Sequence, residues 1–308
     1  MTSKAWKTLC PGDVVDIIAP ASHSPPPKLQ AGVEWLESIG LKARVPVDLI
    51  SPEVFFAAPL ETQLKHLTSA LHSDSKAIWC LRGGYGSMRL IPYLMKMKPT
   101  RPKAFLGFSD ITSLHLFLNQ NWKWPTLHSR VLGQMSVELS HTPDRVELEN
   151  ILMGRQHSVT INNLIPMNEA ALKTKTIQGK LTGGNMRMIQ TSLGSAWEMN
   201  SRGKIVFMED IDERGYSIHR MLEQLHQAKL LTGLKALLFG DFTRASEKDG
   251  KDHSLHALET MAARVSYPVF RGIPSGHGTE LNHTLPFNTD CVLETGLKGK
   301  LILSSGGL

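Results

Sequence analysis

The chain has 308 residues, which is long enough for two domains of ordinary size, and its formal net charge is +6. Its 41% hydrophobic and 20% charged residues are typical of globular proteins, and no apolar stretch approaches the length of a membrane span. No basic run with interleaved aromatic residues favours nucleic-acid binding, and residues 1–7 lack the apolar core of a signal peptide. Cys10, Cys80 and Cys291 suggest no disulfide framework. We therefore expect a cytoplasmic protein without nucleic-acid or membrane partners.

The N-terminal part of the chain alternates predicted strands and helices. Apolar runs predict strands at 14–20, 43–47, 77–81 and 104–108. The apolar spacing predicts helices around 29–36, 64–71, 88–97 and 111–118. This alternation predicts an α/β domain with a parallel sheet and helices on both faces, in which sites form beyond the carboxyl ends of the strands.

The C-terminal part of the chain has a different texture. The pattern weakens from about 135 to 175, so we interpret 141–174 as a linker or crossover between domains at 1–140 and 175–308. Strand-like runs follow at 204–208, 236–239, 292–294 and 300–303, with one clear helix around 218–229. These runs predict a second, smaller domain that is richer in β-structure.

Ser109 lies where a predicted strand gives way to a predicted helix. Residues 104–108 are apolar, whereas Ile111, Leu114 and Leu118 share one helical face. Such a turn lifts a hydroxyl clear of the sheet, and the first backbone amides of the helix can stabilise an oxyanion, as in a nucleophile elbow. Serine is also a favoured N-cap residue, so this segment alone leaves a structural role open.

A glycine-rich loop, Arg82–Ser87, follows the predicted strand at 77–81. Its glycine spacing does not match a dinucleotide-binding fingerprint, and it lacks the Lys-Ser/Thr ending of a P-loop. The glycines allow the backbone to approach a ligand closely, but a plain tight turn is about as compatible with the pattern.

Four carboxylates, at positions 209, 210, 212 and 213, follow a predicted apolar strand. They are compatible with a metal site, with an orienting partner for a histidine, or with solvated loop charge. Glu209 comes directly after the apolar run, so we expect it to be the most fixed and buried of the four. We expect Asp212 and Glu213 to lie in a solvated loop.

His277 lies between two glycines, which leave room for contacts on both sides of its ring. His283 follows six residues later, a spacing that matches no common zinc pattern. Ser109, Glu209 and His277 occur in the chain order of the Ser-acid-His triad of α/β-hydrolases, but Ser109 is not part of a G-x-S-x-G pattern. The residues therefore favour a serine hydrolase on a different scaffold.

At these motifs the chain resembles the LD-carboxypeptidase family, which includes muramoyltetrapeptide carboxypeptidases and microcin C resistance peptidases. The resemblance runs along nearly the whole chain as an ordered set of short motifs. These motifs lie at Gly12–Asp13, Ile18–Ser22, Arg82–Gly86, Gly107–Thr112, Gly183–Asn185, Phe207–Asp210, Arg220–Leu222 and Gly276–His277. Phe108 stands where many members have tyrosine.

The resemblance implies a Ser-Glu-His triad, carried here by Ser109, Glu209 and His277, with no metal or other cofactor. It implies a Rossmann-like N-terminal domain, a β-rich and barrel-like C-terminal domain, a site between them, and commonly a homodimer.

Two further sets of residues are expected to act on the substrate. The backbone N–H of Asp110, with that of Gly84 or Tyr85, is expected to form the oxyanion hole. A free substrate carboxylate needs a cationic or N–H partner, and Arg82 and Arg89 are the candidates near the loop.

The resemblance implies a cytoplasmic serine peptidase of cell-wall recycling. Its substrate would be a murein tetrapeptide, cleaved between an L-configured centre of meso-diaminopimelate and the terminal D-alanine. One alternative is the same chemistry on a peptidyl-nucleotide antibiotic of the microcin C type. A different class of function, a non-catalytic binder of anionic peptides or sugars that uses the glycine-rich loop, also remains open.

Overall fold

The computed structural model describes residues 5–51, 53–278 and 281–308, which form two compact units. The first unit comprises the chain up to His157 together with 284–288 and 305–308, and the second comprises Ser158–His283 and Thr289–Ser304. Helix α5 (Pro143–Leu152) and strand β6 (Ser158–Pro166) occupy much of the segment interpreted as a linker. The division into domains at 1–140 and 175–308, joined by a linker at 141–174, stays a prediction.

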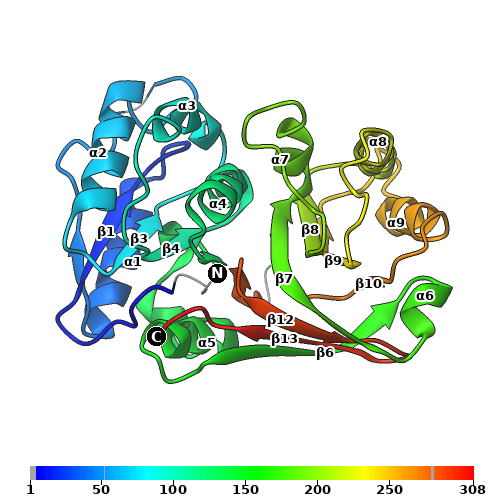
Figure 1. Cartoon of the computed structure of the whole chain (residues 1–308). Helices are drawn as coiled ribbons and strands as arrows, with labels where there is room; N and C mark the ends of the chain where they lie inside the picture. Colours follow the sequence, from blue (N-terminus) through cyan, green and yellow to red (C-terminus); the bar gives the residue numbers. More distant parts are fainter. Residues whose placement is uncertain (1–4, 52, 279–280) are drawn as a thin grey trace. The chain divides into compact units, whose positions relative to one another are not determined.

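The first unit is built on a six-stranded sheet (Figure 1). In spatial order its strands are β11 (Leu285–Phe287), β5 (Thr126–His128), β4 (Ala104–Gly107), β3 (Ala77–Cys80), β1 (Val14–Ile18) and β2 (Lys42–Arg44). All neighbours pair in parallel except β11, which is antiparallel to β5. Every residue of β3, β4 and β5 is buried, as expected for strands covered on both faces.

The strand order places a topological switch point between β1 and β3. The chain continues from β1 to β2 on one side and then returns to β3 on the other side of β1. Ligand sites in open α/β sheets lie beyond the carboxyl ends of the strands at such a point. The glycine-rich loop, which follows β3, therefore lies where the topology favours binding.

The helices of the first unit connect its strands. They are α1 (Pro26–Ser38), α2 (Leu60–His72), α3 (Ile91–Leu94), α4 (Thr112–Phe117) and α5, with a π-helical turn η3 (Leu118–Trp122) and the 3₁₀ turns η1 (Ser87–Leu90), η2 (Ser109–Ile111), η4 (Leu132–Gln134) and η5 (Val137–Leu139). The helix predicted over 88–97 is wrong in its extent, because only η1 and the four residues of α3 form there. Pro92 has no backbone N–H to donate and is tolerated only in a first helical turn, which keeps α3 separate from η1.

The second unit is built on a closed barrel, which confirms the predicted barrel-like fold class. In spatial order its strands are β10 (Val269–Arg271), β6, β13 (Gly299–Ser304), β12 (Asp290–Glu294), β7 (Thr176–Asn185), β8 (Ile205–Ile211) and β9 (Ala236–Thr243). Strands β7, β8, β9 and β10 pair in parallel, whereas β6, β12 and β13 form antiparallel pairs.

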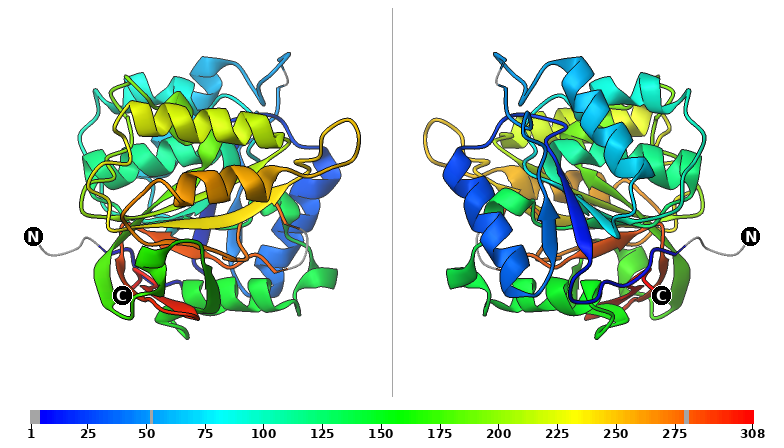
Figure 2. Two further views of the ribbon diagram at one scale, coloured as in Figure 1. Left: turned by 90° about the vertical axis from the view of Figure 1, so that its right-hand side faces the viewer. Right: turned by 90° about the vertical axis from the view of Figure 1, so that its left-hand side faces the viewer.

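Helices α6 (Glu169–Leu172), α7 (Met186–Thr191), α8 (Gly215–Gln227) and α9 (Ser254–Ala262) complete the second unit. Figures 1 and 2 show α8 and α9 side by side, and the two helices are in contact. Helix α8 buries Ile218, Met221, Leu222 and Leu225, the apolar face that the sequence predicts. No helix in the described ranges is long and apolar enough to cross a membrane.

Strand β8 is longer than its apolar run predicts. Glu209 and Asp210 lie inside the strand, paired in register with Asn185 and Phe242, and not after its end as expected from the sequence. Both carboxylates are buried and hydrogen-bonded. Burying a charged side chain inside a strand costs free energy unless hydrogen bonds compensate for the lost water. Here partners from other segments supply such hydrogen bonds.

Candidate active site

Ser109 lies on a strained turn directly after β4. Its backbone φ is 64°, in the left-handed region that residues other than glycine rarely adopt. Phe108 before it is extended, and η2 begins at Ser109. Conformations of this kind persist only where the surrounding structure holds them, and they are frequent at functional sites. The turn thus has the backbone geometry expected of a nucleophile elbow.

The glycine-rich loop packs against this turn. A Cβ atom on Gly83 would lie 3.0 Å from Ser109 Cβ and 3.2 Å from Ser109 Oγ, so the loop backbone reaches the hydroxyl closely only because residue 83 is glycine. The Asp110 carboxylate accepts hydrogen bonds from the backbone N–H of Ser87 at 2.9 Å and of Gly86 at 3.3 Å. Burial raises the pKa of Asp110. Asp110 therefore ties the loop to the turn that carries Ser109.

The two candidate partners of the Asp110 amide in an oxyanion hole differ in their contacts. The backbone N–H of Tyr85 donates to Ser22 Oγ at 3.1 Å, and this hydroxyl donates to the carbonyl of Phe55 at 2.9 Å. The amide of Tyr85 is thus engaged within the first unit, which favours Gly84 as the second donor. The oxyanion-hole role of all three amides stays a prediction.

Arg82 and Arg89 already make contacts within the first unit. Arg82 Nη1 donates to the carbonyl of His23 at 2.7 Å, and the side chain is exposed. The Arg89 guanidinium lies 3.6 Å above the centroid of the Phe56 ring. Their predicted contact with a substrate carboxylate is not tested by these interactions.

Glu209 and His277 form a hydrogen-bonded pair in the second unit. Glu209 Oε2 lies 2.7 Å from His277 Nδ1, and the carboxylate is fully buried. Because a carboxylate accepts, Nδ1 holds the proton, and Nε2 is the unprotonated ring nitrogen that can act as a base. Burial lowers the pKa of His277, but the charge and hydrogen bond of Glu209 outweigh burial, so the pKa lies above its ordinary value of 6.5.

Two residues that the sequence did not single out hold the loop around His277. The side-chain amide of Asn282 accepts from the N–H of Gly276 and donates to its carbonyl, both at 3.0 Å. Asp241, on β9, accepts a hydrogen bond from the N–H of Gly278. The glycines beside His277 indicated close contacts, but their partners come from segments that no local pattern connects to them.

Asp210 neighbours Glu209 but has different partners. Its carboxylate accepts from Asn185 Nδ2 and from the backbone N–H of Arg187, both at 2.9 Å. Burial and the charge of Glu209 raise its pKa to about 7. Asp210 thus braces the end of β7 against β8, whereas Glu209 contacts the histidine.

The last two carboxylates of the cluster, Asp212 and Glu213, differ in their exposure to solvent. Asp212 is exposed, as predicted, and pairs with Arg244. Glu213 lies in a loop, as predicted, but it is less solvated than expected, because its side chain is only 18% exposed. It accepts from Arg187 Nε at 2.9 Å and from Ser217 Oγ at 2.5 Å. Among the described residues, no group of three or more His, Cys, Asp or Glu is arranged to hold a metal ion.

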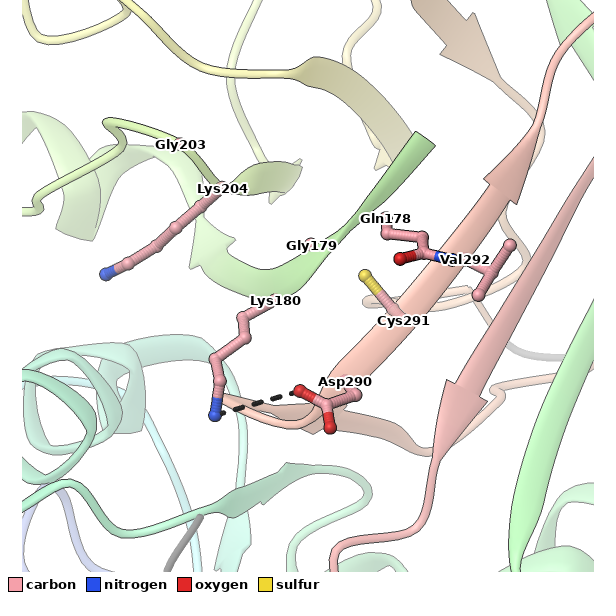
Figure 3. Close-up of a pocket in the computed structure, with 8 residues that line it drawn as sticks. All are labelled: Gln178, Gly179, Lys180, Gly203, Lys204, Asp290, Cys291 and Val292. Atoms are coloured by element: carbon pink, nitrogen blue, oxygen red, sulfur yellow. Dashed lines mark ion pairs between the residues drawn. The ribbon is translucent and has the colours of Figure 1, made fainter. Parts of the chain in front are cut away.

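A pocket of about 680 Å³ lies in another part of the second unit (Figure 3). It is lined by Gln178, Gly179, Lys180, Gly203, Lys204, Asp290, Cys291 and Val292, and Lys180 pairs with Asp290 at 3.9 Å. Because Leu181 pairs with Ile205 at the start of β8, this pocket lies near the amino end of that strand. Glu209 lies toward the carboxyl end, so the pocket does not adjoin the Glu209–His277 pair.

Within the second unit, the structure joins two of the predicted triad residues, Glu209 and His277. Ser109 belongs to the first unit, and Glu209 and His277 belong to the second. The Glu209–His277 hydrogen bond is present, and the hydrogen bond from Ser109 to His277 stays a prediction.

Models of one protein family match most of the chain. Residues 15–129 match the LD-carboxypeptidase N-terminal domain, and residues 178–293 match the LD-carboxypeptidase C-terminal domain. The first match contains Ser109, and the second contains Glu209 and His277.

Individual relatives agree with these matches. A Bacillus subtilis protein named "Probable murein peptide carboxypeptidase" is 31% identical over 98% of this chain and 96% of its own length. A crystal structure of muramoyltetrapeptide carboxypeptidase from Oxalobacter formigenes is 27% identical, with a TM-score of 0.79 over 94% of this chain and 98% of that one.

The microcin C7 self-immunity protein MccF of Escherichia coli is more distant. It is 21% identical over 93% of this chain and 92% of its own length. A structure of MccF in complex with glutamyl sulfamoyl guanosine has a TM-score of 0.82 over 99% of this chain and the whole of that one, at 17% identity. Likeness at this level of identity shows a shared fold.

Proposed function

Because the chain belongs to the LD-carboxypeptidase family, we propose that it is a serine-type carboxypeptidase that releases terminal D-alanine from a murein tetrapeptide. The names of the relatives from B. subtilis and O. formigenes support the murein peptide as substrate. Action in the cytoplasm during cell-wall recycling, and as a homodimer, is part of the same proposal.

The observation that carries the proposal is the hydrogen bond between the buried carboxylate of Glu209 and His277. A carboxylate on Nδ1 fixes the tautomer of a catalytic histidine and stabilises its protonated form. The strained turn at Ser109 supports the assignment of the nucleophile, because it is the one serine of the chain in this conformation among the described residues.

The proposed reaction has two halves. Ser109 Oγ attacks the carbonyl carbon of the scissile amide while His277 Nε2 takes the hydroxyl proton. The carbon–nitrogen bond then breaks, and His277 gives this proton to the departing amine of D-alanine. Water, deprotonated by His277, attacks the acyl-enzyme and releases the shortened peptide and the free Ser109 hydroxyl.

Backbone amides beside Ser109 are proposed to stabilise the negative charge that develops on the carbonyl oxygen. The N–H of Asp110 and that of Gly84 are the favoured donors, because the Asp110 carboxylate and Gly83 hold the loop against the turn. Donors held in place in this way need no rearrangement when the charge appears.

We expect the purified protein to release D-alanine from free murein tetrapeptide without added metal. The peptide bond is joined to the L-configured centre of diaminopimelate, so L,L- and D,D-linked analogues should be cleaved far more slowly. Incubation of the peptides with and without EDTA, followed by mass spectrometry, measures both properties. Activity that requires divalent ions and is lost with EDTA would show that the carboxylates form a metal site and that the triad assignment is wrong.

The titration of His277 is expected to depend on Glu209. His277 must be neutral to accept the proton from Ser109, so activity should rise with pH through a pKa above 6.5. Replacing Glu209 with Gln removes the negative charge that raises this pKa and leaves at most a weaker, neutral hydrogen bond, whereas burial, which lowers the pKa, remains. An NMR titration should therefore show a lower pKa for His277 in Glu209→Gln. An unchanged or higher pKa would contradict the role assigned to the pair.

A further inference from the structure

Arg244 is held at the carboxyl end of β9 by an unusual local arrangement. Strand β9 ends at Thr243, and the next residue, Arg244, has a φ of 52°. Asp212 follows the neighbouring strand β8 and has a φ of 63°. The two side chains form an ion pair at 2.5 Å, and the N–H of Asp212 donates to the carbonyl of Thr243 at 3.0 Å. Arg244 and Asp212 thus both have left-handed backbone conformations, and an ion pair and a backbone hydrogen bond join their two segments.

The same strand holds the loop that carries His277. The backbone N–H of Asp241 donates to the carbonyl of Ser275 at 3.1 Å, and its carboxylate accepts from Gly278. Arg244 is three residues beyond Asp241, so the backbones of these two residues are at most about 10 Å apart. The positive charge of Arg244 lowers the pKa of His277, in the same direction as burial.

Arg244 has hydrogen-bonding capacity to spare. A guanidinium has five N–H donors, and the described residues provide Arg244 with one carboxylate partner while 67% of its side chain is exposed. Arg187, after β7, bonds Glu213 and Gln190. Arg214, after β8, bonds the hydroxyl of Tyr216 and pairs with Glu247. Arg244 is therefore better placed than these two arginines to accept an anion.

The proposed reaction sets where a substrate carboxylate must lie. His277 gives its proton to the departing nitrogen, and the carboxyl carbon of a C-terminal residue is about 2.5 Å from that nitrogen. With a hydrogen bond of about 3 Å between the nitrogen and the ring, the carboxylate lies within about 6 Å of His277 Nε2. Its cationic partner must therefore lie close to His277.

On the basis of the proposed function, we propose that Arg244, positioned by Asp212, binds the free carboxylate of the departing C-terminal residue. This contact would make the enzyme a carboxypeptidase, because a peptide that continues past this residue has no free carboxylate for Arg244 to bind. The assignment differs from Arg82 and Arg89, which lie in the first unit and contact His23 and Phe56.

The test compares two substrates that differ only at the C-terminus. Rates of D-alanine release from the tetrapeptide acid, and of D-alaninamide release from its C-terminal amide, give two values of kcat/KM and an acid-to-amide ratio. We expect Arg244→Gln to lower this ratio about 10- to 150-fold, which corresponds to one hydrogen bond to a charged group. The loss should appear mainly as a higher KM for the acid. Arg244→Lys should recover part of the ratio because it restores the charge.

Arg264→Gln is the matched control. Arg264 is also a partly exposed arginine of the second unit with one carboxylate partner, Glu223, and its replacement should leave the ratio unchanged. Thermal unfolding of each variant reports on folding. Arg82→Gln and Arg89→Gln are measured in the same way, to test the two arginines of the first unit.

The outcomes separate the two proposals. Release of D-alanine by the wild-type protein with an unchanged ratio in Arg244→Gln would overturn the role of Arg244 alone. Equal losses on the acid and the amide would do the same, because they would indicate a general effect on the site. A ratio that collapses in Arg82→Gln or Arg89→Gln, but not in Arg244→Gln, would assign the carboxylate to the first unit. If the wild-type protein cleaves neither substrate, the proposed function fails, and this inference fails with it.

Discussion

Glu209→Gln is expected to lower kcat about 10⁴-fold, the loss seen when the carboxylate of a serine protease triad becomes an amide, while the second unit stays folded. Glu209 is fully buried, and its Oε2 lies 2.7 Å from His277 Nδ1. Glutamine has nearly the same shape but carries no charge, so it can neither stabilise the protonated ring nor enforce the tautomer in which Nε2 is the base. Steady-state kinetics on the tetrapeptide, with thermal unfolding of the same samples, measures both parts.

Three further variants make this result specific. Ser109→Ala should abolish turnover and labelling by a fluorophosphonate probe, because the probe reacts with the nucleophilic hydroxyl. Glu223→Gln makes the same chemical change at a partly exposed glutamate on α8, and it should leave turnover near that of the wild type. Near-normal turnover by Glu209→Gln, together with severe loss in Asp210→Asn, would assign the role to the neighbouring carboxylate.

Gly183→Ala is expected to destabilise the second unit by more than about 4 kcal/mol, a loss comparable with the whole stability of many domains. Gly183 lies in β7 opposite Phe207 of β8 and has a φ of 131°. A Cβ atom there would lie 1.9 Å from the carbonyl oxygen of Phe207, which is backbone and cannot rotate away. The two parallel strands, one of which carries Glu209, would have to separate. Urea unfolding followed by circular dichroism measures the loss.

Gly194→Ala separates the steric effect from the backbone effect. Gly194 also has a positive φ, 73°, but a Cβ atom there would meet nothing within 4 Å. Only the cost of a left-handed alanine, about 1–2 kcal/mol, should appear. Similar losses in the two variants would contradict the close approach of β7 and β8 at Gly183.

Features set by local chemistry could be read from the sequence. The apolar run before Ser109 and the helical spacing after it predicted the turn, because the change from strand to helix is encoded within a few residues. The alternation of strands and helices predicted a parallel sheet for the same reason. The ordered motifs, including the segments at Ser109, Glu209 and His277, predicted the family, which the family models confirm.

Pairings between distant segments were decided only by the tertiary structure. The sequence placed Glu209 after a strand, but β8 continues to Ile211, and His277 from a loop 68 residues away hydrogen-bonds one oxygen of the buried carboxylate. Strand β11 follows β10 of the barrel in the chain and yet pairs with β5 of the first sheet. Asn282 and Asp241 contact the His277 loop, and Asp212 meets Arg244, although no spacing links these residues. A periodic pattern reports which face of an element is buried, whereas the partner that makes a buried charge tolerable is chosen only when the chain is folded.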